Sequence, residues 1–99
     1  MIVFIRSAAI APGKTRDALT FGHQIAKYLG DKHGLKIEVL MPVGGNPNRI
    51  AWRAQYASLG EMEAMTTTLL GEAEYQELVA SNAANLLPGS AHDDIWRTV

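Results

Sequence analysis

Five polar or charged side chains interrupt segments that are otherwise apolar, and they are the residues best suited to bind a ligand or a partner. They are Arg6, Glu38, Arg53, Gln55 and Arg97. If the apolar positions of these segments pack into a core, several of the charges point the other way, into a space between two subunits. A charge buried there must be paired or must hold a ligand. The set therefore predicts an ion-pair network that fixes the register of a dimer, with an anion-binding cavity as the alternative.

Aromatic residues occupy the opposite side of the same segments. Trp52, Tyr56 and Trp96 alternate with the charged positions. Aromatic residues in such places more often form a core than a platform on which a ligand stacks. The candidate ligand-binding residues taken from both sides are Arg6, Glu38, Arg53, Arg97, Trp52 and Tyr56.

The chain has three histidines, His23, His33 and His92. No two of them share a turn of a helix or alternate positions of a strand, as ligand pairs usually do, so we expect no metal site and no cofactor. His23 lies beside an apolar helical stripe and is the one candidate for a proton carrier, although a surface or hydrogen-bonded structural role is favoured. No other catalytic residue is indicated.

Two further motifs carry little chemistry. The run Pro12-Gly13-Lys14-Thr15 ends like a phosphate-binding loop, but Ala8 stands where that loop needs its first glycine, so nucleotide hydrolysis is not expected. The serines have no glycine-flanked nucleophile elbow, which gives serine hydrolysis no support.

Composition narrows the function further. The 99 residues carry a net charge of -1, with lysines and arginines scattered, so nucleic acid is not an expected partner. The absence of cysteine excludes disulfides and thiol chemistry. No apolar run is long enough for a membrane span, and we expect a cytoplasmic protein that does not bind membranes.

The pattern of apolar residues predicts the elements that position these side chains. We expect strands over residues 2–10, 35–43, 49–57 and 94–99 and a helix over 12–33. Ser58 and Glu61 form a capping box, in which the serine caps the third helical amide and the glutamate reaches back to the serine amide. The helix that follows is expected in two pieces with a bend near Gly71.

The order strand, helix, strand, strand, helix, strand predicts a single ferredoxin-like α+β domain, βαββαβ, over residues 1–99. Right-handed crossovers place both helices on one face of a four-stranded antiparallel sheet. The first strand is apolar on both sides, with Ile2 and Phe4 on one and Val3 and Ile5 on the other. We therefore expect a second copy of the chain to cover the bare face, with a partly exposed monomer as the alternative.

Three stretches carry a resemblance to a known group: residues 11–14 (APGK), 41–45 (MPVGG) and 88–97 (PGSAHDDIWR). Together with the divided second helix, they make the chain similar to the dimeric α/β-barrel superfamily, and most to its small NIPSNAP-like proteins. The superfamily includes cofactor-independent monooxygenases acting on polycyclic phenols, haem-degrading enzymes and small-molecule isomerases. The resemblance implies a dimeric barrel with a ligand cavity and no particular reaction.

Three functions follow from these observations. The first is a homodimer that holds a small organic ligand in a pocket at the sheet, with enzymatic turnover left open. The second is a cofactor-independent monooxygenase or isomerase, in which the protein supplies position and a proton carrier such as His23. The third is a purely structural association module. The sequence does not choose between the barrel interior and the helix–sheet cleft as the site.

Overall fold

Strands and helices follow one another in the predicted order, and the computed structural model describes all 99 residues. The strands are β1 (Ile2–Ala9), β2 (Glu38–Leu40), β3 (Arg49–Tyr56) and β4 (His92–Arg97). The helices are α1 (Thr15–His33), α2 (Leu59–Leu70) and α3 (Ala73–Ser81), followed by the short 3-10 helix η1 (Ala83–Asn85). The expected α+β, ferredoxin-like order is confirmed, with the second helix in two pieces.

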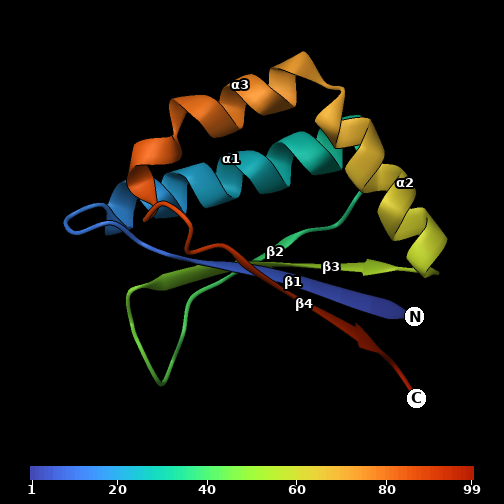
Figure 1. Cartoon of the computed structure of the whole chain (residues 1–99), viewed down its shortest axis with the longest axis horizontal. Coiled ribbons are helices and arrows are strands. Elements are labelled where there is room, and N and C mark those ends of the chain that lie inside the picture. The colour runs from blue at the N-terminus through green and yellow to red at the C-terminus, as the bar shows by residue number, and fades with distance from the viewer.

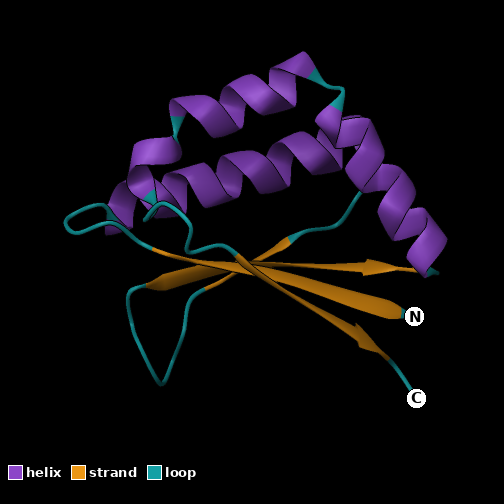
Figure 2. Cartoon of the chain, viewed as in Figure 1, coloured by secondary structure: helices purple, strands orange, loops and turns teal.

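The four strands form one antiparallel sheet in the order β2-β3-β1-β4. All three helices lie on the same side of it (Figure 1), and the colouring by element in Figure 2 separates the two layers. Arg6 of β1 pairs with Trp52 of β3 on one side and with Asp93 of β4 on the other. Side chains directly opposite each other in antiparallel strands share a face, so these three point to the same side of the sheet.

The buried core lies between α1 and the sheet. It consists of two small clusters of fully buried apolar residues. They are Ile10, Ala18 and Ile50, and Phe21, Ile25 and Leu29. Both clusters draw on α1, whose buried residues recur at helical spacing, and the Trp52 side chain packs against both of them. Burial of this stripe therefore fixes α1 across the centre of the sheet.

Gly22 allows α1 to approach the sheet closely. A Cβ atom at this position would lie 2.9 Å from Ile50 Cδ1 and 3.2 Å from Val39 Cγ1. The Gly22 carbonyl also accepts a hydrogen bond of 3.2 Å from the Trp52 indole Nε1. The backbone of α1 at Gly22 thus fixes the orientation of the Trp52 indole ring.

Three elements differ from the sequence prediction by two residues or more. Helix α1 begins at Thr15 rather than Pro12, because Gly13 takes a left-handed turn with a φ of +76°. Strand β2 is only three residues long, and it ends before Pro42, which has no N–H to donate to β3. Strand β4 begins at His92 rather than Asp94, because His92 pairs with Ser7 of β1.

The capping box forms with one change of partner. Ser58 Oγ accepts the hydrogen bond from the Glu61 amide at 3.2 Å, as expected for an N-cap. The Glu61 carboxylate accepts from the amide of Ala57 at 3.3 Å, one residue before the predicted serine amide. The expected bend is present at Gly71 and Glu72, between the end of α2 and the start of α3.

No element of the chain covers the sheet face opposite the helices (Figure 1). Val3 pairs with Trp96 on this face, and Ile5 lies two residues further along β1. Trp96 is 63% exposed, an unusual state for so large an apolar side chain. We call this the outer face. None of the helices is both long and apolar enough to cross a membrane.

Candidate functional site

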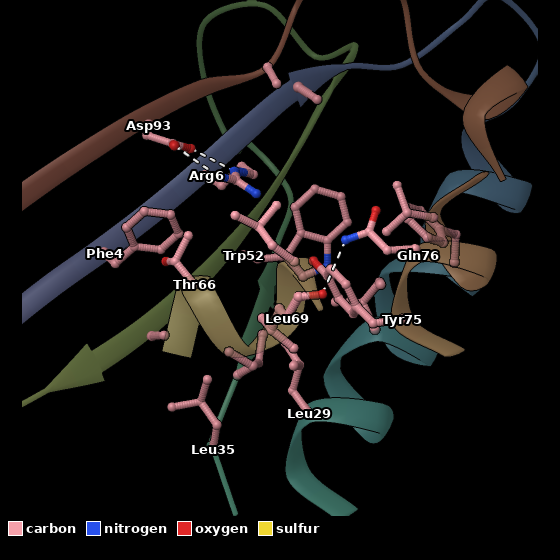
Figure 3. A pocket seen from close by; sticks show the side chains of 18 of the residues that line it. Phe4, Arg6, Leu29, Leu35, Trp52, Thr66, Leu69, Tyr75, Gln76 and Asp93 are labelled. Carbon is pink, nitrogen blue, oxygen red and sulfur yellow. Dashed lines mark hydrogen bonds and ion pairs between the residues drawn. The ribbon is translucent and has the colours of Figure 1, made fainter. Parts of the chain in front are cut away.

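A pocket of about 440 Å³ lies between the sheet and the helices, with 16 hydrophobic residues among the 20 that line it. Its lining includes Phe4 and Trp52 from the sheet, Leu29 of α1 and Leu69 of α2 (Figure 3). Val79 of α3 lines it too. Every layer of the fold therefore contributes to this pocket, and most of its surface is apolar.

One charged pair lies in this apolar lining. Arg6 donates two hydrogen bonds to Asp93, from Nε at 2.7 Å and from Nη2 at 2.9 Å, and Figure 3 shows the two side chains meeting across adjacent strands. The two side chains are 46% and 38% exposed. This hydrogen bonding is the main reason that the pKa of Asp93 is lowered and that of Arg6 is raised. Both groups stay ionised, and their charges cancel within the pocket.

Two tyrosines add hydroxyl groups to the lining. Tyr56 comes from β3 and Tyr75 from α3, and neither hydroxyl has a hydrogen-bond partner within the chain. Burial raises the pKa of both phenols, while the positive charge of Arg6 acts in the opposite direction on each. Both therefore remain protonated at neutral pH and can donate a hydrogen bond to a guest molecule.

The other polar groups in the lining are already used by the fold. The Trp52 indole donates to the Gly22 carbonyl, and Phe21 packs edge-on against its ring with the centroids 5.8 Å apart. Gln76 Nε2 donates to the Leu69 carbonyl at 3.1 Å and ties the start of α3 to the end of α2 (Figure 3). These bonds hold the walls in place and leave the tyrosine hydroxyls and the Arg6–Asp93 pair to face a ligand.

The structure divides the residues that the sequence singled out. Arg6, Trp52 and Tyr56 come together in the pocket. The prediction placed the charges on the side away from the helices, but Arg6 is on the helix side because it pairs with Trp52. Glu38 of β2 and Arg53 of β3 lie directly opposite each other and form an ion pair of 2.6 Å on the outer face.

The remaining candidates lie outside the pocket. Arg97 is exposed near the end of β4 and pairs with Ile2, which itself pairs with Tyr56. Like Arg6, it is therefore on the helix side of the sheet and not on the predicted side with Glu38 and Arg53. His23 is exposed on α1 and is not among the residues that line the pocket. No group of three or more histidine and carboxylate side chains is arranged to hold a metal ion.

Two lining residues escaped the sequence prediction. Asp93 lies just before the strand expected over residues 94–99, and its partner Arg6 is 87 residues away in the chain. Tyr75 lies in the second piece of the divided helix, and its type alone does not separate a ligand contact from a core position. In the sequence, only its closeness to Trp96, three residues later, indicates that Asp93 belongs to a strand.

Comparisons with known proteins identify the fold. No protein-family model matches the chain, and no curated protein matches it. A NIPSNAP domain protein from Burkholderia xenovorans superposes with a TM-score of 0.84 at 14% identity, over 100% of this chain and 95% of that one. A NIPSNAP family protein from Agrobacterium tumefaciens gives 0.80 at 19% identity, over 99% and 85%.

A third solved structure has a similar fold. It is a candidate antibiotic biosynthesis monooxygenase from Nitrosomonas europaea, with a TM-score of 0.74 at 16% identity, over 100% of this chain and 99% of that one. At these identities the likeness establishes the fold alone. The expected ferredoxin-like fold is confirmed, and it is similar to the fold of the NIPSNAP proteins.

Proposed function

Starting from this NIPSNAP-like fold, we propose that the chain binds a small, largely apolar organic molecule in its sheet–helix pocket and that it works as a homodimer. The observation that carries the proposal is the pocket itself. Ligand sites usually occupy roughly 300 to 1,000 Å³, with apolar walls and a few placed polar groups. A volume of about 440 Å³ with mostly hydrophobic lining fits that description.

The pocket is too large to be a packing defect. Side chains from the sheet and from all three helices line it, and it is open to solvent on one side. The chain has only eleven buried residues, so this open pocket leaves apolar surface without a partner. A bound molecule would contact the apolar walls and recover the burial that the chain alone lacks.

The polar groups indicate the charge of the ligand. Asp93 neutralises Arg6, so an anion would have to displace a carboxylate that already makes two hydrogen bonds. A neutral molecule has no such competitor. The free hydroxyls of Tyr56 and Tyr75 would donate to an oxygen of the ligand, such as a carbonyl. We therefore favour a neutral apolar molecule that carries a hydrogen-bond acceptor.

Catalysis on such a molecule is the second candidate function. One neighbour in fold is a candidate monooxygenase, which supports this second candidate. In this chain, the two protonated phenols of Tyr56 and Tyr75 would stabilise negative charge that develops on a ligand oxygen by donating hydrogen bonds to it. A cofactor-independent oxygenase or isomerase would need that stabilisation, because its substrate supplies the reactivity.

The outer face supports the proposed dimer. Val3, Ile5 and the exposed Trp96 would be covered by the same surface of a second copy, and the ion pair of Glu38 and Arg53 would help to fix its register. Light scattering at micromolar concentration should give twice the chain mass of 10.8 kDa. A measured mass of one chain would contradict the dimer.

A matched pair of variants tests the outer face. Trp96→Asp should release monomers, because it places a charge in the apolar patch that the outer face presents. Val99→Asp changes a fully exposed residue at the end of the chain and should remain dimeric. Equal behaviour of the two variants would show that the outer face is not the interface.

Ligand binding can be tested with the neutral fluorescent probe N-phenyl-1-naphthylamine. We expect saturable binding by the wild type and at least tenfold weaker binding by Val79→Trp, which fills the pocket from α3. Val43→Trp places the same side chain on an exposed loop and should bind as the wild type does. Absence of saturable binding, or no effect of Val79→Trp, would refute the proposed site.

A further inference from the structure

A second group of side chains with catalytic geometry lies at the end of α1, outside the pocket. His33 Nε2 is 2.8 Å from Glu72 Oε2 and 3.0 Å from Glu72 Oε1. The Tyr28 hydroxyl donates to Glu72 Oε1 at 2.7 Å. The side chains of His33 and Glu72 are both only 14% exposed. The Glu72 carboxylate is therefore held by two donors from α1.

The contact with Glu72 decides which ring nitrogen of His33 carries the proton. An ionised carboxylate only accepts hydrogen bonds, so Nε2 must be the donor. The hydrogen bond from His33 is the main reason that the pKa of Glu72 is lowered, which keeps this carboxylate ionised. In the neutral ring, the lone pair is then on Nδ1.

The second nitrogen of the ring is free. Nδ1 has no hydrogen-bond partner in the chain. Among residues that are not fully exposed, every buried side-chain nitrogen and oxygen does have a partner. Nδ1 must therefore be accessible from outside. An imidazole oriented through one nitrogen by a carboxylate, with its other nitrogen open, is the arrangement of a general base.

His33 is one of the residues that line a second hollow. This hollow, of about 410 Å³, is shallow and open to solvent, and its lining also includes Thr68 and Glu61 of α2. Leu35 and Tyr56 line both this hollow and the first pocket, so the two spaces adjoin. The hollow has polar and apolar walls, which suits a small organic molecule with one polar end.

We propose that His33 is a general base, positioned by Glu72, that removes a weakly acidic proton from a small organic molecule in the second hollow. The acidic group would be a carbon next to a carbonyl or an activated ring carbon. The proton moves to His33 Nδ1, and its bonding electron pair stays on the molecule. The imidazolium that forms is stabilised by the Glu72 carboxylate, and the proton then passes to product or to water. This site does not depend on occupancy of the first pocket.

The probe 5-nitrobenzisoxazole tests the proposal directly. When a base takes the proton from C3, the electron pair of the C–H bond forms the nitrile and the N–O bond breaks. The ring opens to a single coloured product, 2-cyano-4-nitrophenolate. We expect catalysis above the buffer rate in the wild type. His33→Gln should lose at least about 100-fold, the usual contribution of a general base. Glu72→Gln should lose at least about tenfold, mainly in kcat, because the ring loses its orientation.

Exposed histidines provide the matched controls. His23→Gln and His92→Gln remove imidazoles that lie on the surface, and both should retain wild-type rates. Wild-type protein with no activity above buffer, or equal losses in His23→Gln and His33→Gln, would overturn the proposal. Because the first pocket is tested by its own probe and by Val79→Trp, failure of one site is distinguishable from failure of the other.

Nitrogen-15 NMR of the wild type provides a readout that does not depend on how well the variants fold. At a pH where the His33 ring is neutral, Nε2 should give the shift of a protonated nitrogen and Nδ1 that of an unprotonated one. The reverse assignment would place the lone pair against Glu72 and would also overturn the proposal. In Glu72→Gln, the preference for the Nε2-protonated form should weaken. A role of Glu72 confined to stability would leave that preference unchanged.

Discussion

The close approach of α1 to the sheet predicts opposite effects for the same substitution at two glycines of one helix. An alanine at Gly22 would place its Cβ 2.9 Å from Ile50 Cδ1, and Ile50 is fully buried and cannot swing away. An alanine at Gly30 would find its nearest neighbour, the Leu35 carbonyl oxygen, at an ordinary 3.6 Å. Both substitutions gain about 1 kcal/mol of helix propensity.

The magnitudes follow from these contacts. Gly30→Ala should stabilise the fold by about 0.5–1 kcal/mol, because nothing opposes the propensity gain. Overpacking in a well-filled core costs about 1–3 kcal/mol, so Gly22→Ala should be neutral to destabilising by about 2 kcal/mol. The propensity gain is common to both variants, and the difference of about 1–3 kcal/mol between them measures the overpacking at Gly22 alone.

Thermal unfolding followed by circular dichroism would measure this difference at one fixed protein concentration, since a dimer makes Tm depend on concentration. For a chain of this size, 1 kcal/mol shifts Tm by roughly 4–8 °C. The Trp52 fluorescence of Gly22→Ala should also change, because the indole donates to the Gly22 carbonyl. Equal shifts of Tm in the same direction would refute the argument that α1 is packed tightly at Gly22.

Three further results are expected. Ser58→Ala should destabilise the fold by about 1 kcal/mol through loss of the α2 cap, whereas Ser81→Ala, near the end of α3, should have little effect in the same unfolding assay. Acid should destabilise the fold, because Glu72 and Asp93 have lowered pKa values and the unfolded chain takes up their protons first as the pH falls through their ordinary values of 4.5 and 3.8. A Tm that is flat from pH 6 to pH 3 would contradict this, and Asp93→Asn should make the loss shallower. Arg53→Leu should weaken the dimer in light scattering but leave probe binding unchanged, whereas Arg6→Leu should weaken probe binding.

The sequence predicted the sheet because each strand has its own pattern. Ile50, Trp52, Ala54 and Tyr56 alternate along β3, and all four lie on the helix side as expected. The bend at Gly71 was visible because the apolar stripe changes phase there. These features are local, and a single sequence is enough to show them.

The pocket could not be derived in the same way. Strand β1 has apolar residues on both faces, so its own pattern does not show which face of the sheet Arg6 is on. That choice depends on its pairing with Trp52 and Asp93, which come from distant parts of the chain. The same holds for His33 and Glu72, which are 39 residues apart and meet only because α3 folds back along α1. Both sites depend on contacts between residues that are far apart in the chain. The spacing of residues along the sequence does not reveal these contacts.

The strand order also has a consequence for how the chain folds. β1 is made first and is central in the sheet, but one of its neighbours, β4, is made last. Until β4 is added, β1 is an unpaired edge that is apolar on both faces and holds Arg6 without its carboxylate partner. Such long-range pairing slows folding and exposes an edge to other chains. We therefore expect that the pairing of β4 with β1 limits the rate of folding. We also expect the chain to be prone to aggregation until this pairing has formed.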